Sequence, residues 1–212
     1  MLVHLYRFKN VLFCAVLMAT ASANAHSAPK TALVLGDSLS AEYGLARGAG
    51  WVALLENRLK AEKIEVAVVN ASISGETTSG GKARLPALLK QHKPDYVVIE
   101  LGANDGLRGL PLAAAQANLR QMIELAGQNR AKVMLIGMRI PPNYGRAYTE
   151  GFYTMFGELA KEYKTVLVPF MLDRVALDPS MFQADRMHPN ASAHPIILAN
   201  IWPQFLNLIN AR

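Results

Sequence analysis

Three side chains of this chain could together activate an alcohol for attack on a carbonyl carbon. Ser38 follows an apolar run, and Asp185 precedes His188 by three positions near the C-terminus. A serine hydroxyl is a weak nucleophile at neutral pH unless an imidazole takes its proton, and a carboxylate on the other ring nitrogen orients the imidazole. An aspartate at this spacing can reach that nitrogen within one turn of the chain. We therefore predict that Ser38 is a nucleophile, His188 its general base and Asp185 the orienting acid.

Two further residues have types that could stabilise the negative charge formed by such an attack. Gly75 has no side chain to keep its amide from a developing oxyanion, and Asn104 carries an amide that can donate to the same oxygen. With the backbone N–H of Ser38 they predict an oxyanion hole of three donors. Simpler interpretations stay open, since Gly75 could serve a turn, Asn104 an Asx turn and Ser38 a helix cap.

The other histidines are weaker candidates for the base. His26, His92 and His194 lack an acid at the spacing that joins Asp185 to His188. The histidines are also dispersed along the chain, which does not suit a metal site. We therefore predict no metal and no cofactor.

Short apolar runs alternate with amphipathic stretches along the chain. The apolar runs are unbroken, which is typical of strands buried on both faces, and they predict strands at 31–35, 66–69, 96–101, 132–138 and 166–168. Helices are predicted at 51–61, 82–91, 111–129, 148–163 and 191–209. This alternation predicts an α/β fold, a doubly wound five-stranded parallel sheet between two helical layers.

The candidate catalytic residues all belong to loops at one edge of this predicted sheet. Ser38, Gly75 and Asn104 follow strands, His188 precedes the last helix, and ligands of such sheets bind at the carboxyl ends of the strands. Ser38 is expected on a sharp turn that opens a helix. The turn-forming residues 141–145 belong to the same edge and could line a cleft. Apolar loop residues that we predict to contact substrate, with core packing as an equal alternative, are Ile73, Leu107, Leu110, Pro142 and Tyr144.

The first 25 residues have the pattern of a secretory signal peptide. Basic residues precede an apolar stretch, 11–18, and small residues end the segment at Ala25, with Ala23 as the alternative cleavage position. The stretch is shorter than the roughly 20 apolar residues that span a bilayer. Cleavage would remove Cys14, the only cysteine. We therefore predict a single domain, residues 26–212, exported to the periplasm, with secretion as the alternative, and without a stable membrane anchor.

The formal charge of +6 does not indicate a nucleic-acid partner, because the basic residues are scattered among acids on predicted helices. A second class of function stays open from the residues alone: a non-catalytic module that holds a phosphate or flavin at residues 36–40. Neither Gly-x-Gly-x-x-Gly nor a Walker loop is present, and such a module would not need Asp185 and His188. An enzyme is therefore favoured.

Four segments of the chain resemble, in order, the four sequence blocks of the GDSL, or SGNH, hydrolases. They are Gly36-Asp37-Ser38-Leu39-Ser40, Ile73-Ser74-Gly75-Glu76-Thr77, Gly102-Ala103-Asn104-Asp105, and Asp185 with His188-Pro189. Each block is weak by itself, whereas all four in order are highly specific. The resemblance implies a flavodoxin-like sheet and hydrolysis of carboxylic esters and acyl thioesters through an acyl-enzyme on Ser38. It implies aryl esters, lysophospholipids and, in vitro, fatty acyl-CoA as substrates, with polysaccharide O-deacetylation as the alternative.

Two positions depart from the family pattern. Glu42 stands where relatives often carry a small residue, and Arg186 where a glycine is usual. From these two residues we expect a changed cleft shape or loop geometry and the same reaction. We expect small-molecule acyl substrates and a monomeric protein.

Overall fold

A five-stranded sheet forms the centre of the computed structural model, which describes residues 29–211. All strands are parallel, and their order across the sheet is β2-β1-β3-β4-β5. Their bounds are β1 Lys30–Gly36, β2 Val66–Asn70, β3 Tyr96–Glu100, β4 Lys132–Ile136 and β5 Val166–Val168. The predicted doubly wound parallel sheet is confirmed, with every predicted strand present.

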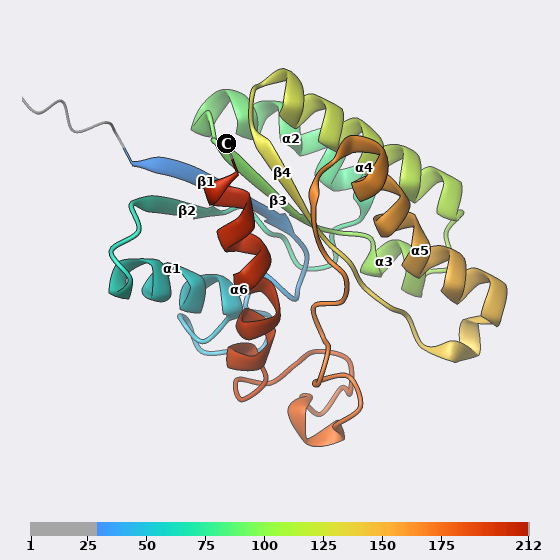
Figure 1. Ribbon diagram of the computed structural model, residues 1–212. Coiled ribbons are helices and arrows are strands. Elements are labelled where there is room, and N and C mark those ends of the chain that lie inside the picture. Colours follow the sequence, from blue (N-terminus) through green and yellow to red (C-terminus); the bar gives the residue numbers. More distant parts are fainter. Residues whose placement is uncertain (1–28, 212) are drawn as a thin grey trace, which may run out of the picture.

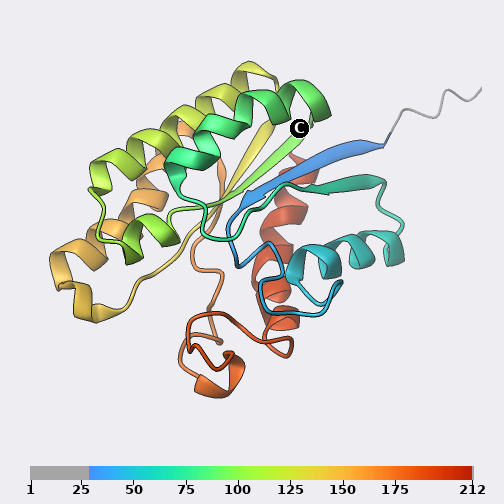
Figure 2. The same cartoon turned by 180° about the vertical axis from the view of Figure 1, so that it is seen from behind.

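Helices cover both faces of the sheet and give three layers (Figures 1 and 2). The helices are α1 Trp51–Ala61, α2 Thr78–His92, α3 Ala103–Leu107, α4 Leu112–Gln128, α5 Arg146–Tyr163 and α6 His194–Asn210, with short 3-10 helices η1 Pro142–Tyr144 and η2 Pro179–Met181. α1 and α6 pack together on one face, and α4 packs against both α2 and α5 on the other. Within residues 29–211, no helix has the length and apolar character needed to cross a bilayer.

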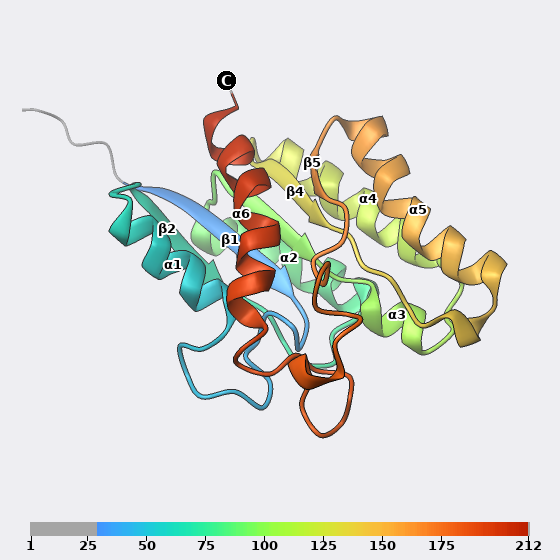
Figure 3. The same ribbon diagram turned by 60° about the horizontal axis from the view of Figure 1, so that its bottom comes forward.

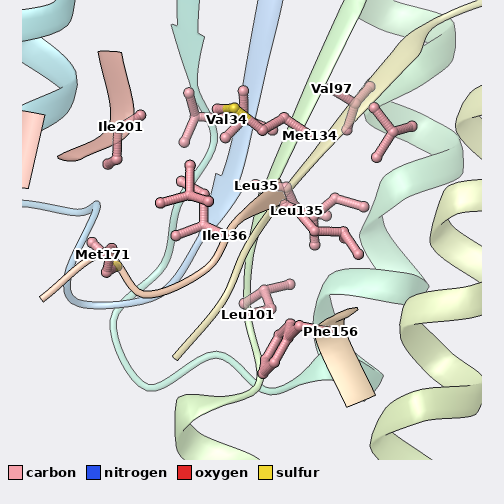
Figure 4. Packing of buried hydrophobic residues seen from close by; sticks show 14 of the residues in the cluster. Val34, Leu35, Val97, Leu101, Met134, Leu135, Ile136, Phe156, Met171 and Ile201 are labelled. Carbon is pink, nitrogen blue, oxygen red and sulfur yellow. The ribbon is translucent and has the colours of Figure 1, made fainter. Parts of the chain in front are cut away.

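The strands bury apolar side chains on both faces, as their unbroken apolar sequences predict. Leu35 of β1 and Leu135 of β4 lie in the centre of the core, with Phe156 of α5 on one side and Ile201 of α6 on the other (Figure 4). This close packing fixes the ends of the strands. The loops that carry the candidate catalytic residues therefore start from rigid positions.

α2 begins four residues earlier than predicted, at Thr78. The side chain of Thr77 accepts a hydrogen bond from the N–H of Gly80 (3.3 Å) and caps the helix. Gly81 lets the first turns lie directly on the sheet, because a Cβ there would come within 2.3 Å of Leu101 Cδ1. Packing against the sheet thus outweighs the poor helix propensity of the glycines.

Two local predictions near the site differ from the structure. α3, which carries Asn104, is not predicted, because five residues are too few to show a helical period. The prediction that a helix opens at Ser38 is wrong, because residues 38–44 form consecutive turns. Glu42 adopts a left-handed backbone conformation (φ 59°), and this stops a helix from continuing.

The long connection between β5 and α6, residues 169–193, projects past the carboxyl ends of the strands and lies beside the connection from β1 to α1, residues 37–50 (Figures 1 and 3). Gln183 Nε2 donates to the carbonyl of Tyr43 (2.9 Å) and joins the two segments. This contact brings the C-terminal part of the chain to the end of β1. The predicted signal peptide, residues 1–25, lies outside the described residues.

Candidate active site

Ser38, His188 and Asp185 form one hydrogen-bonded chain at the carboxyl edge of the sheet. His188 Nε2 lies 3.0 Å from Ser38 Oγ, and His188 Nδ1 lies 2.6 Å from Asp185 Oδ2. Both distances are within hydrogen-bonding range. An imidazole between a hydroxyl and a carboxylate can take the hydroxyl proton while the carboxylate stabilises the resulting imidazolium.

Asp185 is held by the backbone of its own turn. Its Oδ1 accepts hydrogen bonds from the N–H groups of Met187 (2.9 Å) and His188 (3.0 Å), while Oδ2 contacts the imidazole. The backbone hydrogen bonds, together with the bond to the His188 ring, lower the pKa of Asp185 to about 2. Asp185 is therefore ionised at neutral pH. Because Asp185 and His188 are three residues apart, the carboxylate can contact both the backbone N–H and the ring of His188 within one turn.

His188 is also held by contacts other than the one with Asp185. The ring of Tyr43 lies against the imidazole, with 4.4 Å between the ring centroids. The carbonyl of His188 accepts a hydrogen bond from the N–H of Gln183 (2.8 Å), next to an isolated bridge between Phe182 and Pro189. Sequence reasoning missed Tyr43, because its place depends on the turns that follow β1 and these have no sequence signal of their own.

The backbone N–H groups of Ser38 and Gly75 are available as oxyanion donors. Neither group donates to another atom within residues 29–211, and both residues line the same cavity. Gly75 has a φ of +78°, which other residues rarely adopt, and an added Cβ would meet nothing nearer than Arg108 Nη2 at 3.9 Å. In this structure the backbone conformation, and not crowding, therefore requires glycine at this position.

The side-chain amide of Asn104 lies in the same cavity with both of its hydrogens engaged. Nδ2 donates to Asp37 Oδ2 (3.1 Å) and to the carbonyl of Glu76 (2.9 Å). These bonds fix the amide, and an oxyanion would have to replace one of them. Asp37 and Glu76 thus position the Asn104 amide. The sequence analysis predicted this amide as a donor without these two partners.

Alanine in place of Asn104 is expected to lower kcat about a hundredfold to a thousandfold, with a much smaller change in KM. The reason is that the amide is needed most when the carbonyl oxygen becomes negative. Steady-state hydrolysis of p-nitrophenyl butyrate measures both constants. A folded variant with unchanged kcat would show that Asn104 only shapes its loop.

Two carboxyl groups lie buried behind Ser38. Asp37 and Glu100 are 1% and 2% exposed. Glu100 Oε2 accepts from Ser40 Oγ (2.7 Å) and from the N–H of Asp37 (3.2 Å), and Trp51 Nε1 donates to Ser40 Oγ (3.2 Å). Burial raises the pKa of Asp37 to about 6, and burial together with the nearby Asp37 charge raises the pKa of Glu100 well above its usual range.

We expect the free energy of unfolding of the wild-type protein to fall as pH rises, and we expect this fall to be smaller in Glu100→Gln. A carboxyl group whose pKa is raised by folding holds its proton more tightly in the native state. The free energy of unfolding therefore falls as pH increases from the unfolded pKa, about 4.3 for glutamate, through the raised value. Glutamine can still accept from Ser40 and Asp37 but does not ionise. Urea unfolding at about pH 5 and about pH 8 measures the effect. An equal loss in both proteins would contradict it.

A cavity of about 1240 Å³ opens from Ser38 and His188. Its walls come mainly from the segments that follow the strands, the 169–193 connection among them, with Tyr153 of α5 and Asn200 of α6. Apolar side chains predominate among them, including Leu107, Met138, Ile140, Phe170, Leu172 and Phe182. An apolar cavity of this kind suits the hydrocarbon part of a ligand.

The five predicted substrate contacts lie at this edge, but only Leu107 and Pro142 line the cavity. Tyr144 packs against the core and donates its hydroxyl to the carbonyl of Leu107 (2.8 Å). Ile73 and Leu110 are exposed outside the cavity wall. Which loop side chains turn inward depends on loop backbone conformations that the sequence does not indicate.

Glu42 and Arg186, the two residues expected to depart from the family pattern, differ in their relation to the cavity. Glu42 does not line the cavity, since its Oε1 accepts from the N–H groups of Gly48 (3.0 Å) and Gly50 (2.8 Å) and holds the chain ahead of α1. Arg186 does line the cavity, and its backbone is left-handed (φ 56°). Only Arg186 can therefore act directly on the shape and charge of the cavity.

The competing histidines lie elsewhere. His194 is buried, and its Nδ1 accepts from the N–H of Trp51 (3.0 Å), which ties the start of α6 to the start of α1. His92 ends α2, and His26 is outside the described residues. Among residues 29–211, no three or more His, Cys, Asp or Glu side chains are grouped so that they could hold a metal ion.

The chain is also similar in sequence to known proteins. The family described as GDSL-like lipase/acylhydrolase matches residues 34–196, a range that contains all five predicted catalytic and oxyanion-hole residues. The chain belongs to this family. The GDSL-like chain is 51% identical to Esterase TesA of Pseudomonas aeruginosa over 183 residues, which are 86% of this chain and 91% of that protein. It is 45% identical to thioesterase 1/protease 1/lysophospholipase L1 of Escherichia coli K12 over 184 residues, 87% of each.

The fold of this GDSL-like hydrolase also resembles solved structures. A crystal structure of TesA superposes with a TM-score of 0.82 at 52% identity, and the match covers 84% of this chain and 99% of that one. The SGNH hydrolase fold implied by the sequence resemblance is therefore confirmed.

Proposed function

We propose that this carboxylic ester hydrolase cleaves esters and acyl thioesters through an acyl-enzyme on Ser38. The observation that carries the proposal is the position of His188, 3.0 Å from Ser38 Oγ and 2.6 Å from Asp185 Oδ2, at the wall of a large apolar cavity. The printed names of the relatives, esterase and thioesterase 1/protease 1/lysophospholipase L1, support the same reaction class.

In the first half of the reaction, Ser38 Oγ attacks the carbonyl carbon while His188 Nε2 takes the hydroxyl proton. The carbonyl oxygen becomes negative, and the N–H groups of Ser38 and Gly75 and the amide of Asn104 donate to it. The tetrahedral intermediate collapses when His188 returns the proton to the departing alcohol or thiol. The acyl group is then bound to Ser38.

In the second half, a water molecule takes the place of the leaving group. His188 removes a proton from this water as it attacks the acyl carbon, and the same three donors stabilise the second oxyanion. Return of the proton to Ser38 Oγ releases the carboxylic acid. Because all the groups used belong to one chain, we propose that a monomer is active.

The cavity favours acyl groups much larger than acetyl. Its volume of about 1240 Å³ and its apolar side chains suit a hydrocarbon chain, and no observation in the structure favours the alternative of polysaccharide deacetylation. If residues 1–25 direct export, as we propose, the natural substrates are lysophospholipids or exogenous esters. Fatty acyl-CoA is intracellular and is then a substrate only in vitro.

A chain-length series tests this proposal. We expect kcat/KM for p-nitrophenyl esters to rise from acetate to longer acyl groups, since each methylene buried contributes about 0.8 kcal/mol at most, and to level off when the cavity is filled. Decanoyl-CoA and a lysophospholipid of the same acyl length should also be cleaved. Activity confined to acetyl esters would favour the deacetylase, and no ester hydrolysis by folded protein would contradict the proposal.

A further inference from the structure

Arg186 is a charged residue of the cavity wall to which the proposed reaction gives no role. It adopts a left-handed conformation (φ 56°) that disfavours a residue with a side chain. The side chain is exposed and lines the cavity that contains Ser38 and His188. A strained position beside reacting groups is a reason to look for a function.

The guanidinium of Arg186 has no partner within the described part of the chain. It forms no ion pair and donates to no acceptor among residues 29–211. The adjacent carboxylate of Asp185 is already engaged, with one oxygen on the backbone N–H groups of Met187 and His188 and the other on the imidazole. The donors of Arg186 are thus open to solvent and to a ligand in the cavity.

Two other arginines give the same cavity further positive charge. Arg139 lies with its guanidinium 3.9 Å from the centre of the Tyr153 ring, and Arg174 donates to Asn200 Oδ1 (2.7 Å). Neither forms an ion pair within residues 29–211. Asp173 is the one exposed carboxylate of the wall besides Asp185. Three guanidinium groups thus belong to the cavity wall, and Arg186 is the one without a protein partner within residues 29–211.

The apolar character of the cavity indicates which part of the substrate Arg186 would meet. The departing oxygen or sulfur must lie near His188 Nε2, because His188 returns the proton to it. Arg186 is two residues from His188 in the same turn. The apolar side chains that predominate in the cavity suit the acyl chain, so an anionic group bound by Arg186 is assigned to the alcohol part of the substrate. Guanidinium is well suited to phosphate because it can donate two parallel hydrogen bonds.

We propose that Arg186 binds a phosphate on the alcohol part of the substrate and makes the enzyme selective for acyl esters of phosphate-bearing alcohols. This inference rests on the proposed function, because it names a substrate class for the same site. It assigns Arg186 a binding role and no part in the proton transfers.

The test compares two soluble esters with the same acyl group, octanoylglycerol and octanoylglycerol phosphate. The selectivity ratio is kcat/KM for the phosphate ester divided by kcat/KM for the uncharged one. Arg186→Gly, which suits the left-handed backbone, is expected to lower the ratio about fivefold, mainly through a higher KM for the phosphate ester. Raising the ionic strength from about 0.05 M to about 0.5 M should lower the ratio in the wild-type protein more than in the variant.

Arg130→Gly is the matched control. Arg130 is also an exposed arginine with a left-handed backbone (φ 63°), but it lies between α4 and β4 at the opposite edge of the sheet. Its replacement removes the same charge and the same backbone strain, and it should leave the ratio at the wild-type value. Arg186→Lys keeps the charge without the planar fork and should retain part of the selectivity.

An unchanged ratio in Arg186→Gly, or an equal fall in Arg130→Gly, would overturn the proposal. If Arg186→Gly has too little activity for kinetics, calorimetric titration of octanoylglycerol phosphate into Ser38→Ala and Ser38→Ala/Arg186→Gly gives the same answer, since about fivefold weaker binding is expected in the second protein. Equal binding would overturn the proposal. Cleavage of octanoylglycerol tests the hydrolase function separately, so the two failures are distinguishable.

Discussion

His188→Ala is expected to lower kcat for p-nitrophenyl butyrate by a factor of about 10⁴ to 10⁶. Without the imidazole 3.0 Å from Ser38 Oγ, no described group is placed to take the hydroxyl proton. The activity that remains should come from substrate binding and the oxyanion donors. Circular dichroism and thermal unfolding check that the variant is folded.

His92→Ala is the matched control for this variant. His92 lies at the end of α2, and neither hydrogen bonds nor the cavity connect it to Ser38. Its replacement removes an imidazole without touching the site, so kcat should stay near the wild-type value. A folded His188→Ala protein that keeps more than about a hundredth of wild-type kcat would show that another group serves as the base.

Asp185→Asn is expected to lower kcat by a factor of about 10³ to 10⁴. Asparagine Oδ1 can still accept from the N–H groups of Met187 and His188, so the turn should persist. Its amide would then donate to His188 Nδ1 and leave the proton on Nε2, the atom that has to accept the proton of Ser38. The expected loss therefore reflects the wrong imidazole tautomer and not a misplaced ring.

Asp178→Asn provides a control with nearly the same local chemistry. Asp178 also accepts from backbone and side chain in its own turn, through the N–H (2.9 Å) and hydroxyl (2.7 Å) of Ser180, but it lies outside the cavity wall. It should therefore leave kcat unchanged. A loss in Asp185→Asn no greater than the loss in Asp178→Asn would contradict the orienting role of Asp185.

The parts of this protein that sequence reasoning predicted are those with a strong local signal. Unbroken apolar runs such as 96–101 identified the strands, and the carboxyl ends of parallel strands must share an edge. Residues that follow those ends, such as Ser38 and Asn104, were therefore expected close together. The structure places both in the wall of one cavity.

The parts that were not predicted depend on backbone conformations without a sequence signal. Glu42 in a left-handed conformation stops the turns after Ser38 from continuing as a helix, although glutamate has no preference for that conformation. The next residue, Tyr43, lies against His188. The 169–193 connection has no period that would show which side chains face the cavity. Tyr144, in the loop between β4 and α5, was expected either in the cleft or in core packing. It packs against the core and donates to a backbone carbonyl outside the cavity wall.

Labelling by a fluorophosphonate tests most directly whether Ser38 is a nucleophile activated by His188. The reagent bonds covalently to an activated serine, and mass spectrometry of the digested protein locates the adduct. We predict one adduct, on Ser38, which forms in the wild-type protein and in His92→Ala and is absent or far slower in His188→Ala. Labelling of a different serine, or labelling of Ser38 at the same rate without His188, would contradict the account.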